Sequence, residues 1–336
     1  MIYFSTFMIA FMVSIFSTIF FKKLAVKYKI YDEPKSNIKT HKTPIPYLGG
    51  LAIAFSFFFT LIIIRLFTHF ETGTLRNLWG IFLAGFLILI IGLIDDLKDL
   101  NFKIKIFFQF IVATILILFG MKIQFISPDY LAIIFTYLWI IGIINAINLI
   151  DIMDGLSSGI TIIACLAFFF INSTSEAYFV NFAAIALCGA CFGFLKFNFN
   201  PASIFMGDTG SLFIGSVLAA ISLGANYSGN NEIAIFSPIL ILIVPIYDTF
   251  YISYKRIQKG KSIFIGSKDH IALRLNFYGF SIKKTVLILY IFSIFFSLLA
   301  FFIVKTNFKI ALIIYIITLI VSLIIGNKLG KIIVED

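Results

Sequence analysis

Apolar runs of about 20 residues recur along nearly the whole chain of 336 residues, and this recurrence limits the possible folds more than any other feature. Each run has about the length that an α-helix needs to cross the hydrocarbon core of a bilayer. Hydrophobic residues make up 61% of the sequence and charged residues 12%, against about 45–50% and about 25% in an average soluble domain. The strands of an outer-membrane barrel would give a weaker hydropathy per segment. The sequence therefore predicts an all-α polytopic integral membrane protein.

The apolar runs are separated by polar or Gly/Pro clusters, and none of these clusters is large enough to form a second domain. We therefore expect residues 1–336 to form a single transmembrane domain. The runs predict about 11 (10–11) transmembrane helices, at about 1–21, 48–67, 78–94, 106–120, 131–149, 157–172, 178–195, 211–225, 233–254, 285–304 and 309–326.

The basic residues predict the orientation of these helices. The first run has no basic segment before it and is followed at once by Lys22 and Lys23, so we expect its N-terminus outside the cell and the C-terminus in the cytoplasm. The cytoplasmic segments are then 22–47, 95–105, 150–156, 196–210, 255–284 and the tail from 327. They hold 21 of the 26 Lys and Arg residues, as the positive-inside rule requires.

The net charge of +10 is thus explained by topology, and we expect no nucleic-acid partner. The acidic residues are concentrated on the same side of the membrane: 12 of the 16 Asp and Glu residues lie on or near the segments expected in the cytoplasm. The outer loops are short and carry few charges. Function is therefore expected on the cytoplasmic face of the membrane.

Three carboxylates close the third apolar run, within residues 92–99. On a helix, Asp99 can meet Asp95 four residues before it and Asp96 three residues before it. Carboxylates this close repel one another unless a cation joins them, and a divalent ion that bridges substrate phosphates is the usual cation for oxygen ligands. The alternative is a solvated acidic cap of a loop, partly neutralised by nearby lysines.

Four polar side chains end the fifth run at a strict interval of three: Asn145, Asn148, Asp151 and Asp154. Each step of three residues turns back by about 60° on an α-helix, so either the stripe wraps around the helix or the helix ends near Asp151. Asn and Asp are costly at membrane depth and require partners. These side chains form either a functional site or a structural hydrogen-bond network between helices.

A Gly-Asp turn precedes the eighth run, within residues 197–211. Gly207 and Gly210 permit a close backbone approach, and Asp208 offers a carboxylate beside Thr209 and Ser211. The alternative is an Asp that only caps the next helix. A Walker-type phosphate loop is excluded because no Gly-Lys-Ser/Thr follows.

Two basic loops complete the candidate regions. Residues 32–46 contain Lys39 and His41, and residues 255–284 contain His270 and Arg274. Most lysines in such loops serve orientation and contact with anionic lipid. His occurs only three times in the chain, and the presence of two of the three in these loops indicates a function.

The order of these motifs resembles the polyprenyl-phosphate N-acetylhexosamine-1-phosphate transferase family. The matching motifs are D-x-P…K-x-H…P-x-P…GG at 32–50, G-x-x-DD-x-x-D at 92–99, N-x-x-N-x-x-D-x-x-DG at 145–155, F-N…PA…F-x-GD-x-GS at 197–211 and DH-x-x-x-RL at 269–275. The resemblance implies a multi-pass enzyme of the cytoplasmic membrane that transfers N-acetylglucosamine 1-phosphate, or a related N-acetylhexosamine 1-phosphate, from a UDP-sugar to undecaprenyl or another polyprenyl phosphate and releases UMP. This reaction would begin a cell-envelope glycan such as peptidoglycan lipid, teichoic acid or O-antigen.

The resemblance also implies roles for individual residues. Asp208 and Asn148 fall where the family holds Mg²⁺, with Mn²⁺ as an alternative ion. Asp95 matches the carboxylate proposed to deprotonate or orient the attacking lipid phosphate, and Asp96 and Asp99 complete this catalytic group. The residues that match substrate-binding positions are Asp151, Asp154, Lys105, Lys39, His270 and Arg274.

Two departures from the family pattern concern the choice of sugar. Ile152 replaces a common Gly, and Leu273 stands where many bacterial members have a second His. The resemblance is compatible with a homodimer, and it does not specify the sugar or the lipid length.

Two other classes of protein share some of these features. An intramembrane prenyltransferase also uses DDxxD with Mg²⁺, but it carries a second long Asp-rich motif. A transporter or flippase would place ionisable groups near the bilayer midplane and show internal repeats. The sequence contains neither the second motif nor such repeats.

Overall fold

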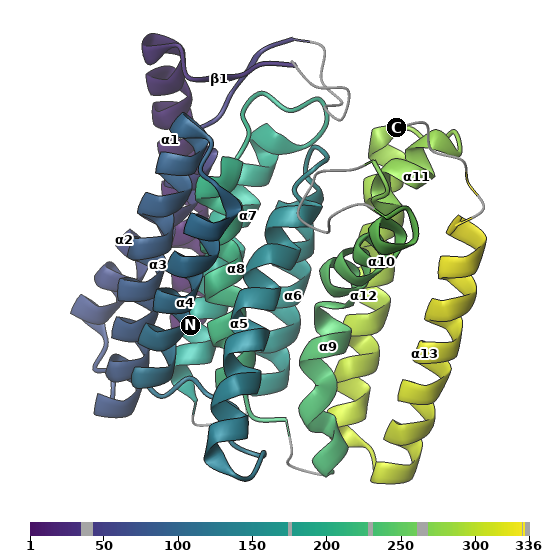
Figure 1. Ribbon diagram of the computed structural model, residues 1–336. Coiled ribbons are helices and arrows are strands. Elements are labelled where there is room, and N and C mark those ends of the chain that lie inside the picture. The colour runs from purple at the N-terminus through teal and green to yellow at the C-terminus, as the bar shows by residue number, and fades with distance from the viewer. Residues whose placement is uncertain (35–42, 174–176, 228–230, 261–267, 331, 333–336) are drawn as a thin grey trace.

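Long helices pack side by side in the computed structural model and form one bundle (Figure 1). The structure describes every residue except 35–42, 174–176, 228–230, 261–267, 331 and 333–336. Each predicted apolar run contains helical residues. The elements are α1 (Ile2–Tyr28), β1 (Tyr31–Asp32), β2 (Ile45–Pro46), α2 (Gly49–Phe67), α3 (Thr72–Lys98), α4 (Phe102–Leu118), α5 (Asp129–Ile150), α6 (Leu156–Asn172), α7 (Tyr178–Asn198), α8 (Gly207–Gly224), η1 (Glu232–Phe236), α9 (Ser237–Ile241), α10 (Ile243–Gln258), α11 (Ile271–Phe277), α12 (Ile282–Lys305) and α13 (Phe308–Gly330).

The predicted all-α polytopic membrane fold is confirmed. In the described part of the chain, eight helices are long and apolar enough to cross a membrane, or nine if one bent pair is counted as a single span. The helices α4 and α6 are shorter, with 17 residues each. The number of eleven spans and the orientation of the termini stay predictions.

The ninth apolar run is not a continuous helix, so the prediction of one helix over 233–254 was wrong. The run divides into η1, α9 and α10, and the axis bends by 74° between the segment that ends at Ile241 and the helix that begins at Ile243. Pro245 explains the break, because it has no N–H to donate to the carbonyl of Ile241 and its ring is tolerated only in the first turn of a helix.

The described parts of several segments that the sequence predicts to be cytoplasmic gather at one end of the bundle. The β1 strand, α11 and the end of α13 lie toward the same end in Figure 1. There β1 and β2 form a short antiparallel ribbon in which Asp32 pairs with Ile45. Because consecutive helices run in opposite directions, the connections 151–155 and 199–206 lie at this end too. Residues far apart in the sequence can therefore form one site.

The helix α8 is buried along most of its length, and small residues let two other helices reach its first turn. A Cβ atom added to Gly92 in α3 would lie 2.6 Å from the Cα atom of Thr209, and one added to Gly50 in α2 would lie 2.2 Å from the nitrogen of Gly210. Only glycine permits this approach of backbone to backbone, as is common between membrane helices. The contact brings the acidic end of α3 against the beginning of α8.

Candidate active site

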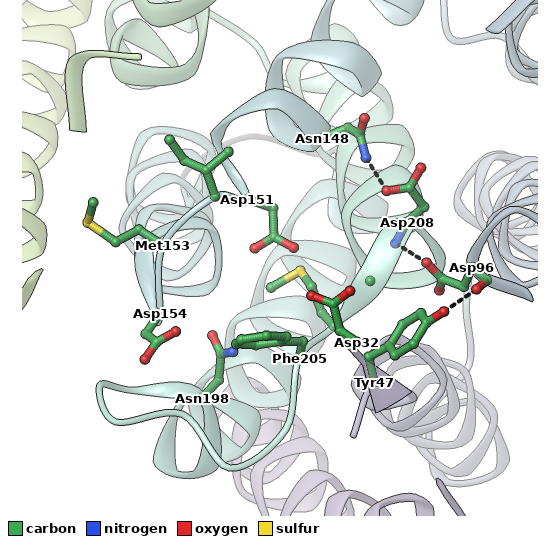
Figure 2. Close-up of a pocket in the computed structure, with 13 residues that line it drawn as sticks. Asp32, Tyr47, Asp96, Asn148, Asp151, Met153, Asp154, Asn198, Phe205 and Asp208 are labelled. Carbon is green, nitrogen blue, oxygen red and sulfur yellow. Dashed lines mark hydrogen bonds between the residues drawn. The ribbon is translucent and has the colours of Figure 1, made fainter. Parts of the chain in front are cut away.

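A pocket of about 270 Å³ opens at the end of the bundle where these segments gather (Figure 2). Its lining residues come from β1, the segment after β2, the ends of α3, α5 and α7, the connections after α5 and before α8, and the beginning of α8. Five of them are carboxylates, which gives the pocket an acidic character. The lining residues are Asp32, Tyr47, Asp96, Asn148, Asp151, Ile152, Met153, Asp154, Asn198, Phe205, Met206, Gly207 and Asp208.

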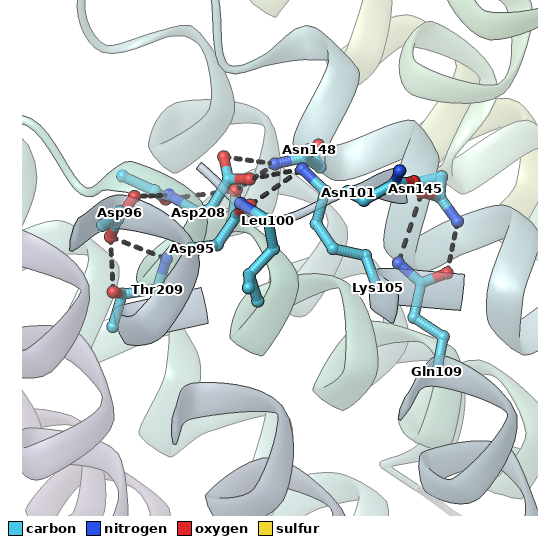
Figure 3. Close-up of polar contacts among 12 residues, drawn as sticks. Asp95, Asp96, Leu100, Asn101, Lys105, Gln109, Asn145, Asn148, Asp208 and Thr209 are labelled. Carbon is cyan, nitrogen blue, oxygen red and sulfur yellow. Dashed lines mark hydrogen bonds and ion pairs between the residues drawn. The ribbon is translucent and has the colours of Figure 1, made fainter. Parts of the chain in front are cut away.

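Asp208 and Asn148, the predicted pair of metal ligands, are in contact in the structure. Asp208 lies in the first turn of α8 and Asn148 in the last turn of α5. The Asn148 side-chain amide donates to Oδ1 of Asp208 at 2.9 Å and to Oγ of Ser211 at 2.9 Å (Figure 3). The carboxylate of one helix and the amide of another are thus held beside each other at the pocket.

Lys105, near the beginning of α4, lies between two carboxylates. Its ammonium nitrogen is 2.8 Å from Oδ2 of Asp95 and 3.1 Å from Oδ2 of Asp208. Asp95 is buried, and its other oxygen accepts the backbone N–H of Leu100 at 2.7 Å. The side chain of Asn101 caps α4 by accepting the backbone N–H of Lys103. The tight turn from α3 to α4 therefore brings a positive charge back to the acidic end of α3.

Asp96 caps the N-terminus of α8, which the sequence analysis did not foresee. Its Oδ1 atom accepts the backbone N–H of Asp208 at 2.7 Å, and its Oδ2 atom accepts the backbone N–H of Thr209 at 3.0 Å and the Thr209 hydroxyl at 2.5 Å. The Tyr47 hydroxyl donates to the backbone carbonyl of Asp96. A carboxylate in this place satisfies N–H groups that have no partner inside the helix. The Asp96 carboxylate thereby fixes the backbone of Asp208.

Asp99 directly follows Lys98, the last residue of α3, and adopts a left-handed conformation with φ of 49°. Its backbone N–H donates to the backbone carbonyl of Asp95 at 2.8 Å. The Asp99 side chain is exposed and does not line the pocket. The meeting of its carboxylate with those of Asp95 and Asp96 stays a prediction. Within the described residues, no group of three or more His, Cys, Asp or Glu side chains is arranged to hold a metal ion.

The four Asn and Asp residues spaced three apart from Asn145 onward do not all have the same role. Some join helices and others line the pocket. The helix α5 ends at Ile150, directly before Asp151, which confirms one of the two expected arrangements. Asn145 exchanges two hydrogen bonds with Gln109 of α4, at 2.6 and 3.3 Å (Figure 3). Asn145 thus belongs to the structural network between helices, whereas Asn148 lines the pocket.

Asp151 and Asp154 lie in the connection from α5 to α6, as the pocket close-up shows (Figure 2). Burial raises the pKa of Asp151 to about 8, and the charges of Asp208, Asp96 and Asp154 add to this effect. The Asp154 carboxylate accepts the side-chain amide of Asn200 at 2.8 Å and the backbone N–H of Ala202 at 2.9 Å. Asp154 therefore joins this connection to the segment before α8.

Several pocket residues were not assigned a role from the sequence. Asn198 and Phe205 belong to a motif that was recognised as a whole, and Asp32 opens another. Tyr47 has no signal of its own beyond its place between the P-x-P and GG motifs. Burial raises the pKa of Tyr47 to about 12, and the charge of Asp96 adds to the effect, so its hydroxyl stays protonated as a donor.

His270 and Arg274 do not line this pocket, although the sequence places them among the substrate-binding residues. Both are buried: Nδ1 of His270 lies 2.8 Å from Oδ2 of Asp248 in α10, and the Arg274 guanidinium donates to Asp269 at 2.5 Å and to the carbonyl of Ile332 at 2.7 Å. These contacts hold α11 against α10 and the chain after α13. Their part in substrate binding stays a prediction.

Lys39, the remaining predicted substrate-binding residue, lies outside the described residues.

The donor set at the beginning of α8 fits Mg²⁺. Carboxylate and amide oxygens are the ligands that hard cations prefer, and Mg²⁺ is commonly held by one or two carboxylates together with substrate phosphates and water. Asp208 and Asn148 supply such a small set. The Lys105 ammonium already lies between Asp95 and Asp208. This position is consistent with two carboxylates that attract a cation.

The fold and the site define a polytopic membrane protein with a polar, acidic pocket, and comparison with known proteins identifies its family. The model of glycosyl transferase family 4 matches residues 78–226. The chain is 33% identical over 335 residues to the probable undecaprenyl-phosphate N-acetylglucosaminyl 1-phosphate transferase of Bacillus subtilis, and the match covers 96% of this chain and 92% of that protein. The chain belongs to glycosyl transferase family 4.

Other relatives include enzymes with two different substrates. A decaprenyl-phosphate N-acetylglucosaminephosphotransferase of Mycolicibacterium smegmatis is 29% identical, with 83% of this chain and 76% of the relative covered. A phospho-N-acetylmuramoyl-pentapeptide-transferase of Streptococcus sanguinis is 29% identical, with 68% of this chain and 74% of the relative covered. Family membership therefore favours a membrane phosphotransferase over the prenyltransferase and transporter alternatives.

Proposed function

We propose that the protein transfers an N-acetylhexosamine 1-phosphate from a UDP-sugar to a polyprenyl phosphate and releases UMP. The observation that carries this proposal is the meeting of Asp208, Asn148 and Lys105 at one end of a membrane-spanning bundle, with an open pocket beside them. The relatives from Bacillus subtilis and Mycolicibacterium smegmatis are named for such a transfer. N-acetylglucosamine is accordingly the first sugar to test.

The chemistry requires a phosphate oxygen of the lipid to attack the β-phosphorus of the UDP-sugar. A new P–O bond forms, the bond from the β-phosphorus to the bridging oxygen breaks, and UMP leaves with that oxygen and its electron pair. No covalent intermediate on the protein is needed, so positioning and charge neutralisation are the main tasks of the site. The Lys105 ammonium brings positive charge to the acidic centre, and the Asp95 carboxylate, which bonds this ammonium, would orient the attacking phosphate.

The residues that would hold Mg²⁺ are Asp208 and Asn148, with Mn²⁺ as an alternative ion. When bound, the ion would neutralise charge on the phosphate oxygens. Asp96 would keep Asp208 in place through the bond to its backbone N–H. Phe205 and Met153 supply apolar surface in the pocket, which suits the flat faces of a uracil ring.

The active site would face the cytoplasm, where UDP-sugars are made available. The support for this orientation is that 21 of the 26 basic residues fall in the segments expected in the cytoplasm, and that the pocket opens at the end of the bundle where described parts of these segments lie. The polyprenyl tail would stay in the bilayer, and its phosphate would reach the pocket at the interface.

The test is an assay of purified protein in detergent with polyprenyl phosphate, Mg²⁺ and a panel of UDP-sugars. The panel contains UDP-N-acetylglucosamine, UDP-N-acetylgalactosamine and UDP-N-acetylmuramoyl-pentapeptide. We expect UMP release and a lipid-linked sugar product with at least one N-acetylhexosamine donor, and strongly reduced activity in the Asp208→Asn variant. Absence of UMP release with every donor would contradict the proposal.

A further inference from the structure

A tyrosine outside the sequence motifs contacts the connection that lines the pocket. Tyr290 lies in α12, whereas the family match ends at residue 226. Its hydroxyl donates to the backbone carbonyl of Gly155 at 2.5 Å. Gly155 directly follows Asp154, and the residues before it, 151–154, all line the pocket.

Side chains from two other helices hold the Gly155 backbone. Gly155 has a φ of 79° and precedes the first residue of α6. Its N–H donates to Oδ1 of Asn198, at the end of α7, at 3.1 Å, and its carbonyl accepts the Tyr290 hydroxyl. The carbonyl also accepts the N–H of Gly159 within α6 at 3.0 Å. The bond from Tyr290 is thus a hydrogen bond that joins this turn to α12.

The space that Tyr290 occupies depends on Gly159, one turn into α6. A Cβ atom at Gly159 would lie 1.9 Å from the Tyr290 hydroxyl oxygen and 2.0 Å from Cζ. No other residue could be present there without moving the tyrosine. The ring therefore lies directly on the backbone of α6, and the hydroxyl reaches the carbonyl at the end of the connection.

We propose that Tyr290 is a positioning residue for the 151–154 connection, and that it sets the affinity for the UDP-sugar. The role rests on the proposed function, since the connection carries two carboxylates of the site. Tyr290 itself does not line the pocket. It fixes the turn at Gly155, which determines where Asp151 and Asp154 enter the pocket. Without it the turn would keep its bond to Asn198 and lose its bond to α12.

The test compares Tyr290→Phe with the matched control Tyr247→Phe. The Tyr247 hydroxyl also donates to a backbone carbonyl, that of Ser322 at 2.6 Å, but it joins α10 to α13 and does not line the pocket. Each variant therefore loses one hydroxyl that bonds a main-chain carbonyl between two helices. For Tyr290→Phe we expect the KM for the UDP-sugar to rise about fivefold to tenfold, as loss of one hydrogen bond typically allows. The KM for polyprenyl phosphate should stay within about twofold of wild type, and Tyr247→Phe should leave both KM values unchanged.

A second measurement does not depend on activity. Hydrogen–deuterium exchange of the detergent-solubilised proteins should be faster over residues 151–158 in Tyr290→Phe than in wild type, and unchanged there in Tyr247→Phe. Equal effects of the two variants on KM and exchange, or an equal rise of both KM values in Tyr290→Phe, would overturn the proposal. A wild-type protein that is inactive with every donor would instead contradict the proposed function, and the exchange experiment would still decide the role of Tyr290.

Discussion

The carboxylate of Asp96 accepts the backbone N–H of Asp208 at 2.7 Å, and this bond joins the end of α3 to the first turn of α8. The same carboxylate accepts two hydrogen bonds from Thr209. Of the adjacent carboxylates in the DDxxD string, Asp95 thus bonds the Lys105 ammonium and Asp96 caps a helix. Neighbours in a helix point about 100° apart, which explains how adjacent residues take different tasks.

Asp96→Asn should therefore act through the position of Asp208. An amide has one acceptor oxygen, so its NH₂ group would face donors that the carboxylate now satisfies. We expect a lower apparent Tm and a loss of turnover of about 10²-fold or more. The matched control is Asp99→Asn, since Asp99 is exposed and lies outside the pocket, and this variant should stay close to wild type in both measurements. Equal losses in the two variants would argue against the capping role.

Asp208→Asn and Asp95→Asn should differ in their dependence on metal. In Asp208→Asn the new side-chain amide would still offer an oxygen but no charge, so we expect the Mg²⁺ concentration for half-maximal rate to rise about tenfold or more, with partial recovery at high Mg²⁺ or Mn²⁺. For Asp95→Asn the rate should fall with little change in this concentration. Titration of Mg²⁺ at saturating UDP-sugar measures the rate and the half-maximal Mg²⁺ concentration for each variant. Identical titration curves would contradict separate roles for Asp208 and Asp95.

Lys105→Met should strengthen metal binding in the absence of substrate. The ammonium now lies 3.1 Å from Asp208, so its positive charge opposes the entry of a cation. Electron paramagnetic resonance of Mn²⁺ should show an affinity about tenfold higher than in wild type, while turnover falls because the charge near the phosphates is lost. Lys103→Met, which changes an exposed lysine on the same helix, serves as the control and should change neither quantity. Unchanged Mn²⁺ affinity in Lys105→Met would contradict this account.

Asp151 should make the metal-free protein less stable as the pH rises. Its pKa in the folded protein is about 8, above the ordinary value of 3.8, because burial and nearby carboxylates disfavour the charged form. The folded state therefore binds this proton more tightly than the unfolded state, and the corresponding stability is complete below pH 3.8 and is lost as the pH rises through about 8. In EDTA, the apparent Tm of Asp151→Asn minus that of wild type should increase between about pH 5 and about pH 9. A difference that is constant or decreases with pH would show that Asp151 is charged in the free site.

The sequence predicts the helices of this fold well because each apolar run is long enough to form one. It fails near Pro245, because the mean hydropathy of the run 233–254 gives no sign of a 74° bend. The end of α5 near Asp151 follows from the strict interval of three between polar residues, which no straight helix can keep on one face.

The candidate site is predicted less completely, because its contacts join distant parts of the chain. The pairing of Asn148 with Asp208 spans 60 residues and could be inferred only through the family resemblance. The capping role of Asp96 depends on a helix that begins more than one hundred residues later in the chain. The DDxxD string that contains Asp96 is equally compatible with a metal site, so the string alone does not indicate a helix cap. Tyr290 carries no local signal at all, since it resembles any aromatic residue of a membrane helix.

The fate of the β-phosphorus of the donor tests the proposed reaction most directly. UDP-N-acetylglucosamine labelled with ³²P at the β-phosphate is incubated with the purified protein, polyprenyl phosphate and Mg²⁺, and the lipid is extracted into organic solvent. We expect the label to enter the lipid fraction in step with the release of unlabelled UMP, and Asp208→Asn to abolish this transfer at ordinary Mg²⁺. Label that stays in the aqueous phase as UDP while the sugar enters the lipid would show transfer of the sugar alone, and the proposed reaction would then be wrong.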